Sequence, residues 1–505
     1  LMDARAVANV ALHRSGYVPG EQDSLLIRMA ASDLPSLEDM VEQEIRKLSN
    51  LKLAIGKQKA LHDALTAPWR RLPFEILSTI FIHALPEDWS VQPAGKRTLN
   101  CMSVCILWHD IAVQTPQLWT SLCFDQDSNP LKNHMHALTI ELRKTGQLPL
   151  EVSMNFLDDE ESWSYEAWAL LCAESHRWQR ISLRQLLRAA YERLSDREFP
   201  ALQALSIGRE DASLAEICLR VLDQESCRPS ALSIAGTGIH CLGLALPSSW
   251  PITELHLDLT TTELTEWAAV RGVVIAYSAT LRTCRICSEL DDDLRVDRWE
   301  TPIDLPCLET LILDSESVQI CHVVACANLQ SLTLCGSATP ADGVLHALKD
   351  LLDNSSECNL LRSLTLRQLD RVWTDYLSWC LNLLRSLTNL ELENNIGDPA
   401  HGRLLSLDVL RQLERTPARP GSMTILPNLE TLSLSFGDAS YDEGESEYVL
   451  AIKDIADSRT RPQTVGGIRL APLKCLHTYG ASVKLPSFER KGEKMHMLWP
   501  STSVP

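Results

Sequence analysis

The sequence predicts an α/β protein in which helices and a short helical block precede a long array of strand–helix repeats. Three observations support this fold class: an apolar 3–4 spacing over residues 34–65, a proline-bounded apolar block over 68–122, and short leucine-rich runs that recur from about residue 200. The 505 residues suffice for two to four domains, or for one domain and a repeat array. We expect a disordered or loose segment over 1–33, an amphipathic helix over 34–67, the helical block over 68–122, the repeats over 123–480 and a tail over 481–505.

Charge and composition restrict the class of partner. Acidic residues outnumber basic ones by 66 to 47, and the net charge of −19 repels phosphate backbones and anionic lipids. We therefore expect protein partners, with no nucleic acid and no membrane. Residues 1–20 lack the basic start and apolar run of a signal peptide, and the sixteen cysteines are scattered singly. These features predict a cytoplasmic and/or nuclear protein with reduced thiols.

The helix predicted over residues 34–67 carries one apolar stripe. Every third or fourth position is Leu34, Leu37, Val41, Glu44, Leu48, Leu51, Ile55, Gln58, His62 and Leu65, of which seven are apolar. Sustained over four heptads, the stripe predicts a short coiled coil or, alternatively, a helix that folds back on its own domain. Pro68 should end the helix because proline lacks the N–H that a helix interior needs.

The block over 68–122 consists of short apolar helices separated by prolines. Pro73 stands where one helix should begin, and Pro86 and Pro116 should each end a helix. The spacing predicts two helices, each with its apolar residues on one face. The apolar face of the first helix consists of Ile76, Leu77, Ile80, Phe81 and Leu85, and that of the second consists of Val104, Cys105, Trp108 and Ile111. A unit of about fifty residues cannot bury this much apolar surface alone, so part of it predicts a docking surface.

This block resembles the F-box, in the F-box-like form found beside repeat domains in the expanded fungal families. The motif is carried, in order, by Leu72-Pro73, Glu75-Ile76-Leu77, Ile80-Phe81, Val104-Cys105 with Trp108, Ile111-Ala112, and Pro116 with Leu118-Trp119. The family often has a basic residue after the cysteine, where this chain has Ile106. That departure removes one polar contact and leaves the apolar face intact.

The resemblance implies that the block binds the small Skp adaptor of SCF-type ubiquitin ligases, and through it a cullin and a RING subunit. The residues that would contact the adaptor by position are Leu72, Pro73, Ile76, Leu77, Ile80, Val104, Cys105 and Trp108. We expect Phe81, Ile111 and Trp119 to pack inside the chain instead.

From about residue 121 the chain changes to runs of the form Leu-x-x-Leu-x-Leu. The central positions of successive runs are Leu205, Leu232, Leu255, Cys284, Leu311, Leu332, Leu364, Leu390, Leu432 and Leu476, with weaker earlier members at Leu150–Val152 and Ile181–Leu183. The first eight are spaced about 26 residues apart, as in leucine-rich repeats. Residues two apart share one face of a strand, so the runs predict inward-facing strands that stack into an irregular leucine-rich-repeat solenoid. A different α/β fold with alternating strands and helices is the alternative.

The repeats depart from regularity in two ways. The usual asparagine after the strand is mostly missing, and only Asn395 fits. Two long gaps near the end predict insertions, one at Pro417–Gly421 and one in the acidic run Asp438–Glu447, which we expect to be a solvated loop or a contact for a basic partner. Exposed positions between the leucines, such as Thr333, Arg367 and Glu391, would face a protein substrate.

Motifs for catalysis or cofactors are not recognised in the sequence. Cys284 and Cys287 have zinc-like spacing without a second pair, and the same holds for Cys321 and Cys326 beside His322. We therefore expect no cofactor, no metal and no enzymatic activity. The leading hypothesis is an adaptor that recruits substrates for ubiquitination; the alternative is a leucine-rich-repeat scaffold without a ligase, and an enzyme of unrecognised type ranks third.

Overall fold

The structure is a computed structural model in which two compact units, Leu1–His83 and Ala84–Pro505, can be distinguished. The residues it describes are 10–86, 100–125, 134–155, 162–184, 188–208, 212–235, 246–258, 267–288, 302–336, 341–355, 358–368, 374–394, 404–416, 425–436, 445–461, 463–465, 467–479, 487–491 and 494–498.

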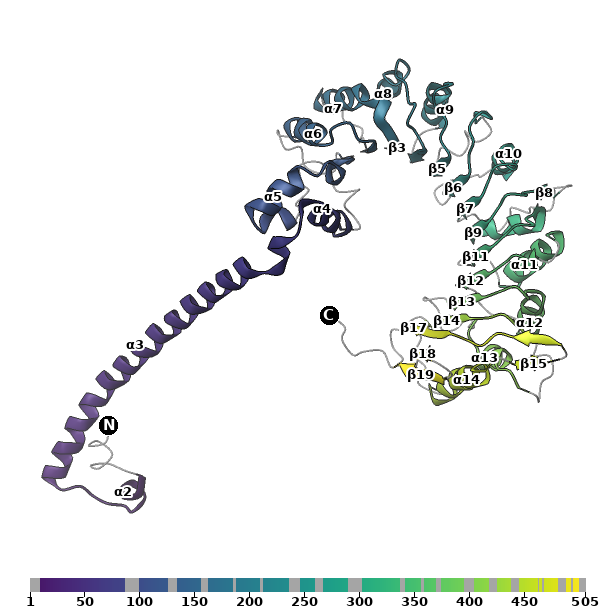
Figure 1. Cartoon of the computed structure of the whole chain (residues 1–505). Helices are drawn as coiled ribbons and strands as arrows, with labels where there is room; N and C mark the ends of the chain where they lie inside the picture. Colours follow the sequence, from purple (N-terminus) through teal and green to yellow (C-terminus); the bar gives the residue numbers. More distant parts are fainter. Residues whose placement is uncertain are drawn as a thin grey trace. The chain divides into compact units, whose positions relative to one another are not determined.

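The first unit is dominated by one long helix (Figure 1). Its elements are α2 (Val10–Arg14), α3 (Glu21–Thr66), η1 (Pro68–Arg71) and α4 (Phe74–His83). Helix α3 has 46 residues and begins at Glu21, so the prediction of a loose segment up to residue 33 is wrong for its second part. Glu21 and Asp23 lie in the first turn, where carboxylates interact favourably with the helix dipole. The helix ends at Thr66, two residues before Pro68, as predicted.

The second unit opens with three short helices, η3 (Asn100–Ser103), α5 (Ile106–Val113) and η4 (Pro116–Trp119). Pro116 occupies the start of η4, where its missing N–H costs nothing. The indole Nε1 of Trp119 donates a hydrogen bond of 3.0 Å to the Ala112 carbonyl, which ties η4 to α5. The Thr115 hydroxyl donates at 2.7 Å to the Ile111 carbonyl and satisfies one of the last acceptors of α5.

A single sheet of fifteen strands forms the rest of this unit, in the order β1-β2-β3-β4-β5-β6-β7-β9-β11-β12-β13-β14-β17-β18-β19. The strands are β1 (Ser121–Asp125), β2 (Leu150–Asn155), β3 (Trp178–Arg184), β4 (Ala204–Gly208), β5 (Ala231–Ala235), β6 (Glu254–Asp258), β7 (Thr283–Ser288), β9 (Thr310–Ser315), β11 (Ser331–Cys335), β12 (Ser363–Arg367), β13 (Asn389–Glu393), β14 (Thr431–Ser435), β17 (Cys475–Tyr479), β18 (Ser487–Lys491) and β19 (Lys494–Leu498). Each pairs in parallel with the next until β17, after which β18 and β19 pair antiparallel.

Helices cover the outer side of this sheet, and its strands line the inner side (Figure 1). They are α6 (His134–Lys144), α7 (Ser162–Ala173), η5 (Ser175–Arg177), α8 (Arg188–Glu192), α9 (Ala212–Leu222), α10 (Trp267–Ala276), η7 (Glu316–Val323), α11 (Ala341–Asn354), α12 (Thr374–Leu383), α13 (Leu407–Leu413) and α14 (Glu445–Ser458). Two short strand pairs lie in the connections. One joins β8 (Ile303–Asp304) to β10 (Val324–Ala325), and the other joins β15 (Gln463–Val465) to β16 (Ile468–Leu470).

The register of the sheet aligns the predicted repeat centres in one continuous ladder. Leu205 pairs with Leu232, Leu232 with Leu255, and the row continues through Cys284, Leu311, Leu332, Leu364, Leu390 and Leu432 to Leu476. All ten side chains are at most 2% exposed. The weaker members Val152 and Ile181 extend the same row at its start. The predicted fold class, N-terminal helices followed by a stacked α/β solenoid, is therefore confirmed.

Two details of the repeats differ from the sequence analysis. The asparagine that supports a turn is Asn394, which is buried and accepts a 2.8 Å hydrogen bond from the Leu405 backbone N–H, whereas Asn395 lies outside the described residues. The predicted tail over 481–505 contains the hairpin of β18 and β19, which continues the sheet. The insertion at Pro417–Gly421 and most of the acidic run lie outside the described residues, but Glu445 and Glu447 begin α14.

Two buried arginines fix the last long connections of the solenoid. The guanidinium of Arg459 donates to the carbonyls of Leu413, Ile425 and Leu426 at 2.8–3.3 Å, and its side chain is fully buried. Arg415 donates to the carbonyls of Ala471, Leu426 and Pro427. Burial lowers the pKa of Arg415 to about 10, and burial followed by the charge of Arg415 lowers that of Arg459. The carbonyl acceptors compensate the cost of burying these two like charges.

Candidate protein-binding surfaces

Helix α4 presents apolar side chains to solvent on one face and buries others. Ile76 and Ile80 lie one turn apart and are 48% and 44% exposed. Leu77 and Phe81, one residue further on in each case, are buried at 1% and 2%. The exposed pair is therefore not needed for the folding of this chain, and it forms a surface that a partner can cover.

The residues before α4 set the direction in which it begins. Leu72 is half-buried and Pro73 exposed, between the end of η1 and the start of α4. The Pro73 carbonyl accepts a 3.1 Å hydrogen bond from the Leu77 N–H, the first bond of the helix. Pro73 thus starts the helix as predicted, and its own ring remains accessible.

Helix α5, in the second unit, and the two residues before it have the same division, although Val104 and Cys105 precede the helix instead of sharing its face with Trp108 as predicted. Val104 is 49% exposed, Ile106 is 81% exposed, and Cys105 and Trp108 are half-buried. Ile111 and Ala112 are buried. Cys105 has extended backbone at the start of the helix, with no side-chain hydrogen bond to the first turn.

Seven of the eight predicted contact residues retain accessible surface, and one does not. Those that do are Leu72, Pro73, Ile76, Ile80, Val104, Cys105 and Trp108. Leu77 is sealed inside the chain, because it falls on the face of α4 that also carries Phe81, so it does not belong to the exposed surface. Phe81, Ile111 and Trp119 are buried, as the core-packing interpretation predicts.

Sequence reasoning missed four exposed apolar residues in the described part of this block. Phe74 and Ile82 in α4 are 41% and 36% exposed, and Leu107 in α5 is 46% exposed. Ile106, at 81%, is the most exposed large apolar side chain among the described residues of the block. Ile106 was noted only as a departure from the family pattern. Its place at the first position of α5, directly after the extended Cys105, is the signal that could have identified it as a surface residue.

Comparison with known families decides the nature of this block. Residues 69–125 match the F-box-like family model. The match begins at Trp69 in η1 and ends with β1, so it includes both α4 and α5.

Among the curated proteins none matches this sequence. A solved structure titled "Crystal structure of Rad7 and Elc1 complex in yeast" contains a chain that is similar over 78% of this chain and 93% of that one, at 14% identity and a TM-score of 0.30. A likeness this distant carries no argument about function.

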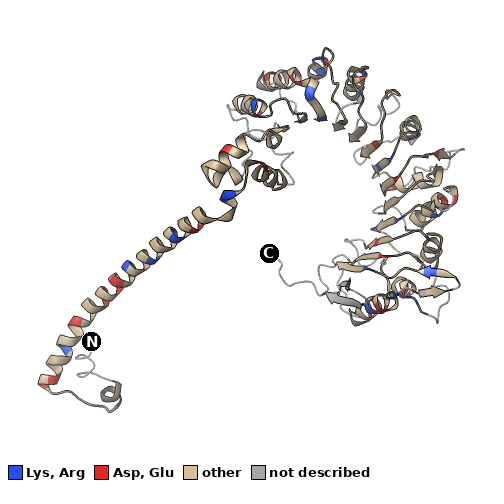
Figure 2. Cartoon of the chain, viewed as in Figure 1, with Lys and Arg blue, Asp and Glu red and all other residues tan. Residues whose placement is uncertain are grey.

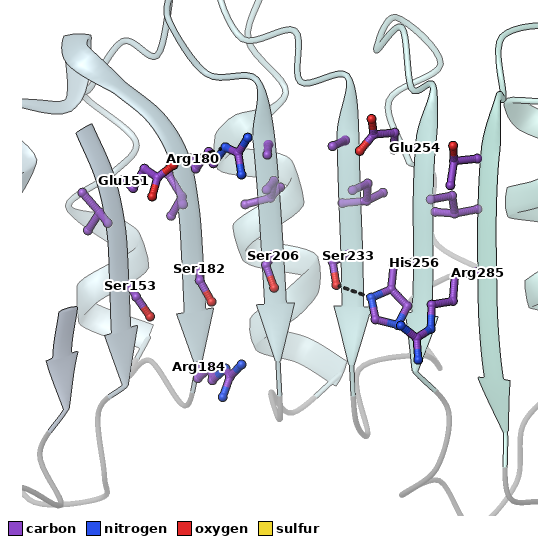
Figure 3. Close-up of a pocket in the computed structure, with 18 of the residues that line it drawn as sticks. Glu151, Ser153, Arg180, Ser182, Arg184, Ser206, Ser233, Glu254, His256 and Arg285 are labelled. Carbon is purple, nitrogen blue, oxygen red and sulfur yellow. Dashed lines mark hydrogen bonds and ion pairs between the residues drawn. The ribbon is translucent and has the colours of Figure 1, made fainter. Parts of the chain in front are cut away.

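A second candidate surface lies on the inner side of the solenoid. A trough of about 460 Å³ is lined mainly by β2 to β7, with Ser121 of β1 and Ile312 of β9 at its two ends. Its floor is a row of hydroxyls from Ser153, Ser182, Ser206 and Ser233, one from each of four adjacent strands, which Figure 3 shows in line. The row continues as His256 on β6 and Arg285 on β7. The four serine side chains are small, and they leave the space that forms the trough.

Charged side chains border the serine row. Arg180 forms an ion pair of 3.4 Å with Glu151, and Arg285 one of 3.6 Å with Asp314. Arg184 lies against Gly208 on the next strand, where an added Cβ would approach its Cγ to 3.3 Å. Gly208 thus leaves the room that the Arg184 side chain occupies at the edge of the trough.

His256 is the titratable group at the end of the serine row. Its Nδ1 lies 3.5 Å from the Ser233 hydroxyl (Figure 3). Partial burial, followed by the nearby Arg285 charge, lowers the pKa of His256 below its usual value. The imidazole is therefore neutral at pH 7 and serves as a hydrogen-bonding group rather than as a cation.

The predicted substrate-facing residues lie further along the same inner surface. Thr333 occupies the row that continues from Arg285 through Ile312, and Glu391 follows two strands later. Arg367 pairs with Glu391 at 3.0 Å and with Glu393 at 3.2 Å. Ion-paired side chains occupy this part of the inner surface, where the trough has serines. The trough is therefore the better-formed recess.

The cysteines singled out in the sequence are packing residues in the described structure. Cys284 occupies the leucine ladder, and burial raises its pKa to about 12. Cys287 donates from its thiol to Asp314 at 2.9 Å. Within the described residues, no group of three or more potential ligands is placed to hold a metal ion. Within the same residues, no helix is both long and apolar enough to cross a bilayer.

Proposed function

We propose that this chain is a substrate-recruiting adaptor of an SCF-type ubiquitin ligase, acting in the cytoplasm or nucleus as a binding protein rather than an enzyme. The observation that carries the proposal is the F-box-like match over residues 69–125, in a block that leaves Ile76, Ile80 and Val104 nearly half exposed. A Skp-type adaptor would cover these side chains, and a cullin and RING subunit would follow.

The contact would draw its free energy from apolar burial. Each large apolar side chain that becomes fully buried contributes about 1.5–3 kcal/mol, and less here because about half of each is already covered. Association costs free energy because translational and rotational freedom are lost. The free energy gained by burying the exposed apolar area must exceed that cost, and this area comes from Leu72, Ile76, Ile80, Val104 and Trp108. Pro73 and Phe74 beside α4, and Cys105 and Ile106 beside α5, would add to the apolar area that the adaptor covers.

The adaptor side is tested by titrating the purified full chain with a purified Skp-type adaptor by calorimetry. We expect Ile76→Asp with Trp108→Ala, and separately Ile76→Asp with Ile80→Asp, to abolish binding, because a carboxylate would be desolvated in the contact. Ile82→Asp is the matched control, since Ile82 lies on another side of α4 and is 36% exposed. Unchanged binding by both double variants would refute the assignment.

The solenoid would hold the protein substrate, and we propose the trough on β2 to β7 as the contact. Its serine hydroxyls both donate and accept hydrogen bonds, which suits the backbone of an extended segment. Its volume of about 460 Å³ accommodates a few side chains. The leucine-rich repeats would then be the substrate-binding part of the chain.

Filling the trough separates the two binding activities. We expect Ser206→Trp or Ser233→Trp to leave adaptor binding unchanged and to remove substrate proteins from the set recovered with the intact complex. Ser433→Trp is the matched control, because Ser433 lies in the same inner row on β14 but does not line the trough. Equal recovery by trough and control variants would place the substrate elsewhere.

The second candidate function is a repeat scaffold that binds partners without a ligase. The charge-paired inner surface around Arg367 favours neither role, since either protein would present it to a partner. The calorimetric titration distinguishes the two: a scaffold binds no Skp-type adaptor, while its trough variants still lose a partner.

A further inference from the structure

Helix α3 leaves its apolar stripe uncovered along its whole length. Of the stripe residues, Leu37 is the most covered, at 37% exposed, and Leu65 the least, at 65%. Leu48, Leu51 and Ile55, in the middle of the stripe, are all between 56% and 63% exposed. A helix of this length with an exposed stripe at coiled-coil spacing lacks the surface that would pair with it.

The charges of α3 are divided between its two halves. Residues 21–45 contain seven acidic side chains and one basic one, for a net charge of −6. Residues 46–66 contain five basic side chains and one acidic one, for a net charge of +4. In Figure 2 most of the ribbon coloured for Asp and Glu lies toward the start of α3, and most of that coloured for Lys and Arg lies toward its end.

Several of these charges stand directly beside the stripe. In the heptad that places Leu34 and Leu37 at the core positions, Asp33 and Glu38 flank the stripe in the first half. Lys47, Lys52 and Lys59 flank it in the second half. Flanking charges set the partner and orientation of a helix pair, so this division decides between the two ways of pairing α3 with itself.

A parallel pair in register would place acid against acid and base against base, whereas an antiparallel pair opposes the acidic half to the basic half of the other helix. The seam is also interrupted by Glu44, Gln58 and His62. Apolar burial alone is therefore weak, and the orientation depends on the charges.

We propose that two copies of this chain associate through α3 as an antiparallel helix pair. A second copy fits this surface because α3 itself supplies both a stripe of the right spacing and a complementary charge pattern. The inference does not rest on the adaptor function, since α3 ends at Thr66, before the F-box-like match begins.

Sedimentation equilibrium of the full chain tests the pairing. We expect a dimer that dissociates more readily as salt is raised from 0.05 to 0.5 M, because salt screens the opposed charges. The variant D33K/E38K/D39K should raise the dimer Kd about tenfold or more, since it sets lysines against Lys52, Lys57 and Lys59. Adding K52E/K57E/K59E to the same chain should restore the wild-type Kd to within about threefold.

The same variants identify the competing arrangements. A parallel dimer would respond little to D33K/E38K/D39K, because the contact between Asp33 and Glu38 of the other copy becomes a contact between two lysines and stays repulsive. Raising the salt concentration would strengthen such a dimer, because it screens the like charges. A wild-type chain that is monomeric at up to about 50 μM and low salt would overturn the proposal. Leu48→Asp with Leu51→Asp should give a monomer with an unchanged thermal transition, which would separate loss of pairing from loss of fold.

Zero-length carboxyl–amine crosslinking gives the orientation directly. In a mixture of ¹⁵N-labelled and unlabelled chains, an antiparallel pair should give mixed-isotope links between peptides around Glu38 and peptides around Lys52 or Lys57. Links between copies confined to the centre of the helix, around Glu44 and Lys47, would contradict it.

Discussion

Helix α3 and the solenoid both contain leucine at regular spacing, yet one exposes these leucines and the other buries them. In α3 the stripe residues are 37–65% exposed, whereas the ten side chains of the strand ladder are at most 2% exposed. The difference lies in where the covering surface comes from. Each strand repeat is covered by the next repeat of the same chain, while among the described residues of its unit α3 has no second stripe to cover it. Regular leucine therefore indicates a folded core only when its partner follows in the sequence.

Helix α4 has buried and exposed apolar residues side by side. Of the changes considered, Phe81→Ala should lower the free energy of unfolding most. Phe81 is buried and Ile80 is 44% exposed. Removing a buried phenylalanine costs about 3–5 kcal/mol of unfolding free energy, whereas truncating an exposed side chain stays within about 0.5 kcal/mol. Urea denaturation of Phe81→Ala and Ile80→Ala provides the comparison. A similar loss for both would mean that the exposed face of α4 is part of the core.

In the solenoid, Leu364→Ala should cost about 2–5 kcal/mol because the ladder cannot close over the cavity. Leu364 is fully buried in β12, while Leu360, before the same strand, is 47% exposed. Leu360→Ala is therefore the matched control and should be near neutral. Hydrogen exchange measures both variants repeat by repeat, and loss of protection should be greatest in β11, β12 and β13. Uniform loss along all repeats would show that the array unfolds as one cooperative unit.

The long connections at the end of the solenoid are held by polar contacts as well as by the ladder, and Arg459→Met tests the polar part. The change leaves the carbonyls of Leu413 and Ile425 without their guanidinium donor, whereas the Leu426 carbonyl keeps Arg415 as a donor. We expect a loss of about 1–3 kcal/mol in all once relief of the repulsion from Arg415 is included. Arg461→Met is the exposed control. A stabilised Arg459→Met variant would mean that the two buried like charges outweigh their hydrogen bonds.

The smallest effect is expected from pH at His256. The folded state lowers the pKa of this imidazole, so the unfolded state binds its proton first as pH falls. The stability it contributes is complete above the ordinary histidine pKa of about 6.5 and is lost below it. Between pH 7.5 and 5, wild type should therefore lose slightly more unfolding free energy than His256→Gln. An equal loss would show that His256 has the same pKa in both states.

Much of the solenoid could be predicted because leucines two residues apart lie on the same face of a strand and therefore indicate its buried side. Helices α11 and α12 lie between the leucine-rich runs, in segments whose apolar residues recur at helical spacing. The start of α3 was missed because its first turns lack a clear stripe and Pro35 argues against a helix. The hairpin of β18 and β19 was missed because its strands are short and rich in charged residues.

The candidate surfaces were predictable to different degrees. The F-box-like block is a local pattern, and its residues could be named from the sequence, but the burial of Leu77 depends on which side of α4 is covered. The trough depends on register between strands far apart in the chain. Its signal was present as serine in the middle of four runs, at 153, 182, 206 and 233, although only the paired strands bring these into line.

The two rows of the solenoid strands have a consequence for how such a protein changes over time. Leucines in the ladder point into the core, while the serine row beside them points to the inner surface, and neither row shares a side chain with the other. Substitutions in the serine row can therefore alter which molecule fits without disturbing what keeps the chain folded. A gene duplicated many times could diversify its recognition one rung at a time while each descendant still folds.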